Sequence, residues 1–308
     1  MTPRNHLELS LPRALKRGDT LGIVAPASPF DRKAFDAGIR VLETMGFSLA
    51  VGEDVFLKRG YLAGSDRCRA DLLNRMFADP AIDGIICARG GYGAMRILPL
   101  LDVDAIASHP KVFVGFSDIT VLLGFLVKRC HMVAFHGPTV TTLGNGSPST
   151  RDHFQLALTQ PVPLTIAAEP NQVIRAGRAA GRFLCGNLTL FSHLTGTPFQ
   201  PDFNDCILLV EDQGEAPYRL DRMLTQMLMA GCFRGLAGLA LGSFKRCGAT
   251  EEIHHIVADR MGGLNIPILA GFDVGHDAVN MTLPVGLPVQ LDTGSGTLTF
   301  AGPAVREP

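Results

Sequence analysis

One serine stands where its hydroxyl could act as a nucleophile. The apolar run Lys111–Phe116 is typical of a buried strand, leads directly into Ser117, and is followed by an apolar helix from Asp118 onward. A serine at the carboxyl end of a strand lies where open α/β sheets place their sites, and a sharp strand-to-helix turn projects its side chain. The motif departs from Gly-x-Ser-x-Gly because Ile119 takes the last glycine position. The alternative is that Ser117 only caps the helix.

A glycine-rich segment follows another predicted strand. Arg89–Gly93 contains three glycines and comes directly after the apolar run Gly84–Ala88. Glycines let a backbone approach a ligand closely, and successive N–H groups can bind an anion. Neither the Gly-Lys-Ser/Thr of a phosphate loop nor the G-x-G-x-x-G spacing is present, which disfavours nucleotide binding. An oxyanion-binding loop and a plain tight turn both stay open.

The second half of the chain supplies an acid and a histidine. The apolar run Cys206–Val210 ends in an acidic cluster that includes Glu211 and Glu215, and His276 follows another apolar run in a loop with glycines. A carboxylate at a strand end can orient an imidazole, and a loop histidine can act as a general base. The alternative is that the acidic residues and His276 are solvent-exposed side chains without a catalytic role. Ser117, Glu211 and His276 are each expected just beyond a strand end, in the chain order of the α/β-hydrolase triads.

Metal and disulfide chemistry are disfavoured. His131 and His136 are five residues apart across a predicted strand and should point to opposite faces. His254 and His255 are adjacent on a predicted helix, where neighbouring side chains do not converge. The seven cysteines are scattered and include no Cys-x-x-Cys pair, a pattern typical of reduced thiols.

Composition indicates a globular α/β protein. The chain has 308 residues, 46% hydrophobic and 19% charged, so it can build a large core. Its 28 basic and 29 acidic residues leave no excess charge for a nucleic-acid partner. The longest apolar stretches reach about half of the ~20 residues that a membrane span needs. The N-terminus shows no signal-peptide pattern, so we expect a cytoplasmic protein without a membrane partner.

Hydrophobic periodicity divides the chain into two parts. The first half alternates strand-like and helix-like segments, which predicts a parallel sheet covered on both faces. Leu143–Asp152 is rich in glycine, serine and proline and reads as a linker, and Pro284–Phe300 predicts a hairpin that turns at Gly294–Gly296. We expect an N-terminal α/β domain over residues 1–145 with the nucleophile. This domain is followed by a linker region over residues 146–175 and by a C-terminal domain over residues 176–308, which carries the acid and the histidine.

Seven short motifs, in order along nearly the whole chain, resemble those of the LD-carboxypeptidases. This serine peptidase family includes cytoplasmic muramoyltetrapeptide carboxypeptidase and the microcin C self-immunity proteins. The motifs are GDTLGIVAPASP (Gly18–Pro29), ARGGYG (Ala88–Gly93), VGFSDIT (Val114–Thr120), HGP (His136–Pro138), GNLTL (Gly186–Leu190), EDQGEAPYRLDRMLTQM (Glu211–Met227) and GFDVGH (Gly271–His276).

The resemblance implies a Ser-Glu-His triad. Ser117 would be the nucleophile, His276 the general base and acid, and Glu211 the group that orients the histidine. Glu215 is the competing acid, and Glu211 is preferred because it directly follows the predicted strand. The implied fold is an N-terminal Rossmann-like domain with a parallel sheet and a C-terminal α/β domain with a small barrel-like sheet. The site would then lie between the domains.

The resemblance also implies groups that bind the substrate. The oxyanion hole would take backbone N–H groups from Gly91 or Tyr92 and from Asp118. A cation must bind the free carboxylate of the substrate, and the sequence does not choose among the available ones. The residues proposed to bind substrate are Arg89, Tyr218, Arg219 and Arg222.

The implied reaction is hydrolysis of the amide between an L-configured centre of a diamino acid and a terminal D-alanine, as in peptidoglycan recycling. It needs no metal or organic cofactor, and family members are commonly homodimers. One alternative is an immunity-type hydrolase with the same triad that acts on a peptidyl or aminoacyl nucleotide. Another is a binding protein on the same fold, in which Ser117 is only a cap.

Overall fold

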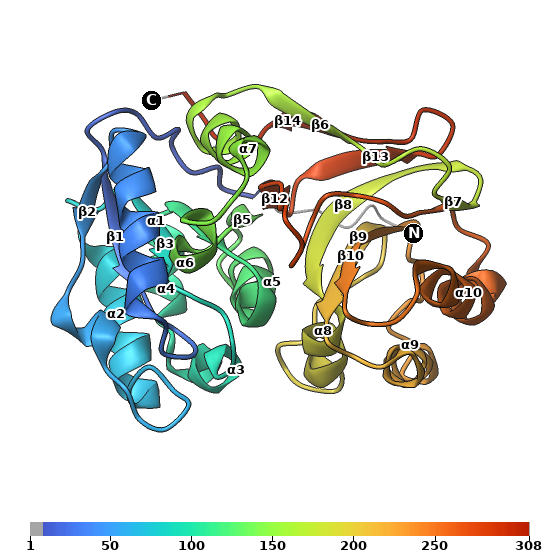
Figure 1. Cartoon of the computed structure of the whole chain (residues 1–308), viewed down its shortest axis with the longest axis horizontal. Helices are drawn as coiled ribbons and strands as arrows, with labels where there is room; N and C mark the ends of the chain where they lie inside the picture. The colour runs from blue at the N-terminus through green and yellow to red at the C-terminus, as the bar shows by residue number, and fades with distance from the viewer. Residues whose placement is uncertain (1–8, 308) are drawn as a thin grey trace.

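A computed structural model of the chain describes residues 9–307, and its N-terminal half is built on a six-stranded sheet. The strand order is β12-β5-β4-β3-β1-β2, and all neighbours are parallel except β12, which is antiparallel to β5 (Figure 1). Every residue of β3, β4 and β5 is buried, as in parallel sheets covered on both faces. The strands are β1 Thr20–Val24, β2 Ser48–Ala50, β3 Gly84–Cys87, β4 Val112–Gly115, β5 Ala134–His136 and β12 Leu283–Val285.

Two of the helices of this half begin at side-chain caps. Asp31 accepts a hydrogen bond from the Ala34 N–H at 2.8 Å, and Ser65 accepts one from the Cys68 N–H at 3.1 Å. The helices are α1 Arg32–Thr44, α2 Asp66–Ala78, α3 Ala94–Ile97, α4 Val103–Ser108, α5 Thr120–Arg129 and α6 Val140–Leu143. The 3₁₀ turns are Glu53–Phe56, Leu98–Leu100 and Ser117–Ile119.

The C-terminal half is built on a mixed sheet of eight strands in the order β6-β14-β13-β8-β9-β10-β11-β7. Its centre, β8 to β11, is parallel, and the outer strands are antiparallel to their neighbours. The strands are β6 Pro163–Ala167, β7 Val173–Arg175, β8 Arg178–Asn187, β9 Cys206–Gln213, β10 Gly238–Lys245, β11 Ile268–Leu269, β13 Pro288–Asp292 and β14 Thr297–Pro303. The helices are α7 Pro148–Thr159, α8 Leu188–Leu194, α9 Pro217–Met229 and α10 Thr250–Met261, with a 3₁₀ turn at Gly262–Leu264.

The predicted α/β architecture with two sheets is confirmed, and so is the C-terminal hairpin, because β13 and β14 pair antiparallel. One local expectation is wrong. Strand β9 continues through Gln213, so Glu211 lies inside the strand and is buried rather than standing beyond its end. A carboxylate can occupy a buried strand position only where donors from other segments meet it, which the local pattern does not reveal.

The two halves are joined both by the segment that connects them and by a strand that returns to the N-terminal sheet. The predicted linker region 146–175 contains α7, β6 and β7, and β12 from the C-terminal part completes the N-terminal sheet by pairing Leu283 with His136. Helix α5 lies between the two sheets and packs against α8 and β8 (Figure 1). No helix within residues 9–307 is long and apolar enough to cross a membrane.

Helix α1 depends on a glycine at its contact with α6. A Cβ on Gly38 would lie 1.9 Å from the Val140 carbonyl oxygen. We expect Gly38→Ala to lower the free energy of unfolding by about 1–3 kcal/mol, because backbone atoms must move to admit the methyl group. Gly262→Ala is the matched control: nothing lies within 4 Å of its added Cβ, and we expect a change within about 0.5 kcal/mol. Urea unfolding measures both, and equal stabilities would contradict the prediction.

Candidate active site

Ser117 lies on a strained turn, one residue after the end of β4. Its φ of 64° is in the left-handed region, which costs a non-glycine residue about 1–3 kcal/mol and persists only where the surroundings hold it. Gly115 packs against Ile119, whose Cγ2 would lie 2.7 Å from an added Cβ. The Ser117 hydroxyl has no hydrogen-bond partner among residues 9–307, and neither this turn nor α5 has a side-chain cap. The geometry therefore does not fit a helix-capping serine.

The glycine loop lies against this serine. A Cβ on Gly90 would be 2.8 Å from Ser117 Cβ, so only glycine allows this approach. The Tyr92 N–H donates to Ser28 Oγ at 3.0 Å and is therefore already paired. The Gly91 N–H has no partner in the described part of the chain. Of the two donors expected from this loop, Gly91 is the one left available.

The Asp118 carboxylate ties the serine turn to the glycine loop. It is buried and accepts a hydrogen bond from the Ala94 N–H at 2.8 Å, at the start of α3. Buried Arg69 donates to the Gly93 carbonyl oxygen at 2.8 Å and holds the loop from its other side. Burial raises the pKa of Asp118, and the Ala94 bond and the Arg69 charge oppose that rise. The backbone N–H of Asp118 has no partner within residues 9–307.

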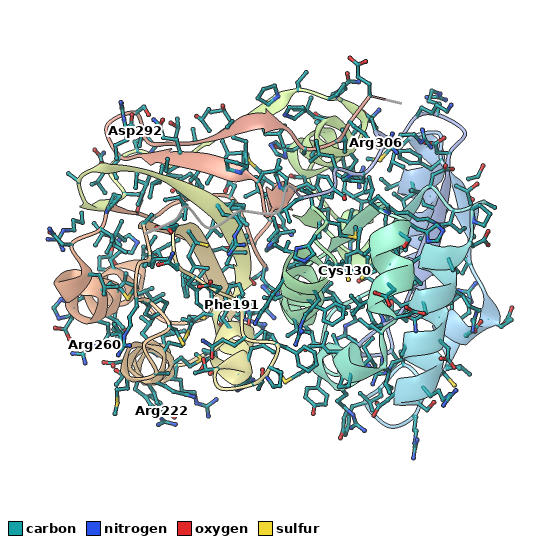
Figure 2. The ribbon with its side chains drawn as sticks, turned by 180° about the vertical axis from the view of Figure 1, so that it is seen from behind. Cys130, Phe191, Arg222, Arg260, Asp292 and Arg306 are labelled. Carbon is teal, nitrogen blue, oxygen red and sulfur yellow. The ribbon has the colours of Figure 1, made fainter. Side chains whose placement is uncertain are left out.

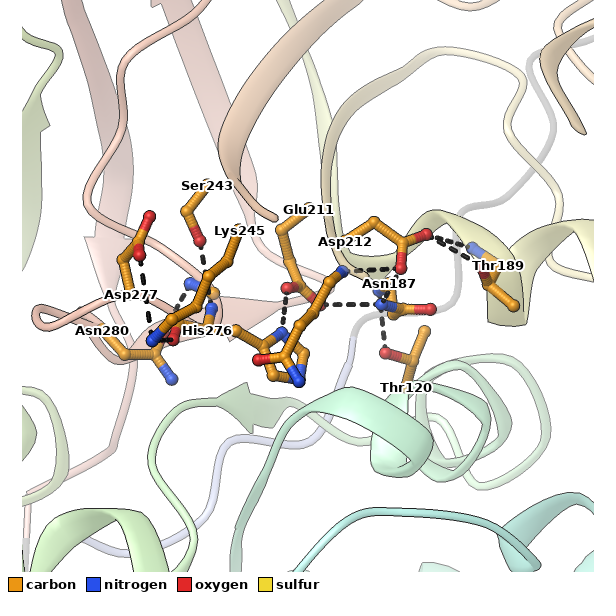
Figure 3. A network of polar contacts seen from close by, with 12 residues as sticks. Thr120, Asn187, Thr189, Glu211, Asp212, Ser243, Lys245, His276, Asp277 and Asn280 are labelled. Atoms are coloured by element: carbon orange, nitrogen blue, oxygen red, sulfur yellow. Dashed lines mark hydrogen bonds and ion pairs between the residues drawn. The ribbon is translucent and has the colours of Figure 1, made fainter. Parts of the chain in front are cut away.

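A buried carboxylate contacts the predicted histidine. Glu211 Oε2 is 2.5 Å from His276 Nδ1, and its side chain is wholly excluded from water (Figure 3). Asn187 Nδ2 donates to Glu211 Oε1 at 3.3 Å. Burial raises the pKa of Glu211, and the hydrogen bond and charge of His276 oppose that rise. The competing acid, Glu215, instead pairs with Arg219 at 3.4 Å.

The serine and the histidine meet across the two halves of the chain. Phe116, directly before Ser117, packs its ring on the His276 imidazole with centroids 4.8 Å apart. No hydrogen bond joins Ser117 to His276 in this structure. Such bonds are often long in free enzymes and shorten when substrate binds. The structure thus brings together the serine turn, the glycine loop and the carboxylate–imidazole pair.

A second buried carboxylate, which the sequence pattern did not single out, supports the first. Asp212 accepts hydrogen bonds from the Thr189 N–H at 2.9 Å, the Thr189 hydroxyl at 2.8 Å and Asn187 Nδ2 at 3.0 Å. Asn187 therefore bridges Asp212 and Glu211, and its own N–H donates to Thr120 Oγ1 at 2.9 Å, across to the serine's domain (Figure 3). Asn187 belongs to the GNLTL motif, so the motif was the available signal for this residue.

The predicted substrate-binding residues form two exposed groups. Arg89 lies beside the glycine loop and donates to the Pro29 carbonyl oxygen at 2.8 Å. The other three lie near the start of α9, where the Arg222 guanidinium is 5.2 Å from the centroid of the Tyr218 ring. Arg222 lies at the periphery of the molecule, on the outer side of that helix (Figure 2). Cations are thus available on both halves of the chain.

Two α/β parts that meet at a serine turn and a carboxylate–imidazole pair are typical of a peptide hydrolase. The chain belongs to the LD-carboxypeptidase family, peptidase family S66. Residues 21–137 match the LD-carboxypeptidase N-terminal domain, and residues 180–291 match the C-terminal domain. The family resemblance drawn from the seven motifs is confirmed, and the chain is a hydrolase that acts on peptides.

Relatives align over nearly the full chain. It is 35% identical to a probable murein peptide carboxypeptidase of Bacillus subtilis, with 93% of this chain and 92% of the relative covered. It is 33% identical to the murein tetrapeptide carboxypeptidase of Pseudomonas aeruginosa, with 88% and 92% covered. Among solved structures, the wild-type microcin C7 self-immunity protein MccF superposes with a TM-score of 0.88 at 25% identity, with 96% and 100% covered.

The raised pKa of Asp118 predicts a pH-dependent stability. At pH values between its ordinary pKa of 3.8 and its raised folded-state pKa, the folded chain holds a proton that the unfolded chain has lost. Stability therefore falls as pH rises through that window. Asp118→Asn keeps an acceptor for the Ala94 N–H without a charge, so we expect its stability relative to wild type to rise with pH there. Urea unfolding at several pH values measures this, and a pH-independent difference would contradict it.

Proposed function

We propose that the protein is a serine LD-carboxypeptidase that releases the terminal D-alanine of a murein tetrapeptide. The observation that carries the proposal is the buried Glu211–His276 pair, 2.5 Å apart, beside the strained turn of Ser117. The substrate class is supported by two relatives at 33–35% identity that are named for murein peptides. We further propose a homodimer that works in the cytoplasm, as the family resemblance suggests.

In the proposed mechanism, Ser117 Oγ attacks the carbonyl carbon of the scissile amide. His276 Nε2 takes the hydroxyl proton and delivers it to the departing amine of D-alanine, which leaves an acyl-enzyme ester. A water molecule then attacks the ester while His276 again accepts and returns a proton. Glu211, bonded to Nδ1, holds the imidazole in the required tautomer and stabilises its protonated form.

The tetrahedral oxyanion would be bound by the N–H groups of Gly91 and Asp118, which have no partner within residues 9–307. Each such donor typically contributes about 3–4 kcal/mol of transition-state stabilisation. The terminal carboxylate of the substrate needs a cation, and Arg89 on the serine's side and Arg219 or Arg222 on the other side are the proposed candidates.

A second candidate is an immunity-type hydrolase of a peptidyl or aminoacyl nucleotide. The observation in its favour is the TM-score of 0.88 with MccF. The chain has no tryptophan to stack on a base, although Tyr92 and Tyr218 are more than half exposed. The murein assignment is preferred because the two murein-named relatives are more similar in sequence.

The nucleophile is tested by D-alanine release from a murein tetrapeptide. We expect wild type to release D-alanine and Ser117→Ala to lose the activity, because no other residue of the proposed triad can form the acyl-enzyme. Ser48→Ala, at an exposed position of β2, is the matched control and should retain full activity. Absence of release by folded wild type would reject the murein substrate. Release by Ser117→Ala at the wild-type rate would reject the serine mechanism.

The choice of acid is tested by comparing two glutamates. We expect Glu211→Gln to lower kcat by about 10⁴-fold, because the amide can no longer hold the required tautomer of His276. Glu215→Gln should cost far less, since its carboxylate faces Arg219 instead of the imidazole. Steady-state kinetics with the same tetrapeptide measure both variants, and an equal loss in the two would contradict the assignment.

A further inference from the structure

Strand β10 carries an irregularity directly opposite the buried glutamate. Leu241 pairs with Val210 and Phe244 pairs with Asp212, so Gly242 and Ser243 stand opposite Glu211 alone. Two residues against one define a β-bulge, which is rare in parallel pairs and re-aims the side chains of the bulged strand. The bulge therefore changes where Ser243 points at the level of Glu211.

The bulge turns Ser243 toward the loop that bears the histidine. The Ser243 N–H donates to the Val274 carbonyl oxygen at 2.8 Å. Ser243 Oγ accepts a hydrogen bond from the His276 N–H at 3.0 Å. Two residues further along β10, Lys245 Nζ donates to the His276 carbonyl oxygen at 2.8 Å (Figure 3). Both backbone polar groups of His276 are thus held by side chains of one strand.

Glycines at two positions allow the histidine loop to pack closely against β10. A Cβ on Gly275, whose φ is 124°, would lie 2.6 Å from Ser243 Oγ and 2.8 Å from Glu211 Oε2. A Cβ on Gly242 would lie 2.4 Å from the Val274 carbonyl oxygen. The Gly275 N–H also donates to Asn280 Oδ1 at 2.9 Å. The close packing leaves the backbone before His276 little freedom to shift.

We propose that Ser243 and Lys245 are positioning residues that clamp the backbone of His276, an inference that rests on the proposed serine mechanism. Glu211 fixes the rotation of the imidazole through its contact with Nδ1. Ser243 and Lys245 fix the position of the His276 backbone, from which the imidazole projects. A displacement of about 1 Å at a catalytic group can cost 10²-fold in rate. The clamp therefore sets the distance from His276 Nε2 to Ser117 Oγ, and it contacts no reacting atom.

The test compares Lys245→Met with Lys245→Arg. Methionine keeps the length of the side chain without the donor, and arginine keeps a donor. We expect Lys245→Met to lower kcat for D-alanine release about 10- to 100-fold with little change in KM, and Lys245→Arg to recover part of the loss. Lys128→Met is the matched control, because Lys128 Nζ also donates to a backbone carbonyl oxygen, that of Gln200 at 2.6 Å, far from His276 in the chain. Ser243→Ala should resemble Lys245→Met.

A second readout does not depend on the substrate. The rate at which a fluorophosphonate probe modifies Ser117 reports how well His276 activates the hydroxyl, and it should fall in parallel with kcat while Tm stays unchanged. Wild-type labelling rates in stable Lys245→Met and Ser243→Ala would overturn the clamp and leave the proposed function standing. Labelling of wild type without D-alanine release would reject only the murein substrate, and the labelling rates would still decide on the clamp. Absence of wild-type labelling and turnover would overturn both proposals.

Discussion

The site depends on a carboxylate that is completely shielded from water. An ionised group in that position is costly unless charged or polar donors surround it. Glu211 receives them from His276 and from Asn187, which lie on segments distant in the sequence. The end of β8, the last part of β9 and the histidine loop must therefore converge on one point. Loss of either donor would leave part of the carboxylate unpaired, which ties the histidine's position to the stability of the C-terminal half.

The same network connects the two halves of the molecule. Asn187 reaches the start of α5 through Thr120, Phe116 packs on the imidazole of His276, and β12 adds a strand to the other sheet. The serine follows a strand of the N-terminal sheet, whereas the histidine loop is held by β10 of the C-terminal sheet, so their distance also depends on how these sheets dock. Contacts across the interface consequently act on the geometry of the reaction as well as on stability.

The serine turn stores strain that its neighbours hold in place. The left-handed backbone of Ser117 is fixed between Gly90 on one side and the hydrogen bond of the Asp118 carboxylate to α3 on the other. Among the described residues 9–307, that arrangement leaves the hydroxyl and the N–H groups of Gly91 and Asp118 without partners. Strained backbone with unpaired donors is typical of a site organised for a ligand, since the ligand supplies the missing bonds.

The sequence by itself determined the alternating strands and helices of the first half, the C-terminal hairpin, the turn at Ser117 and the family, because these follow from short-range periodicity and from motifs read along the chain. Only the tertiary structure decided that Glu211 is buried inside β9, that Ser28 occupies the Tyr92 N–H, and that a bulge aims Ser243 at the histidine. Each of these depends on partners from distant segments. Local patterns report which face of an element is apolar, whereas the pairing of polar groups between elements is settled only when the elements pack together.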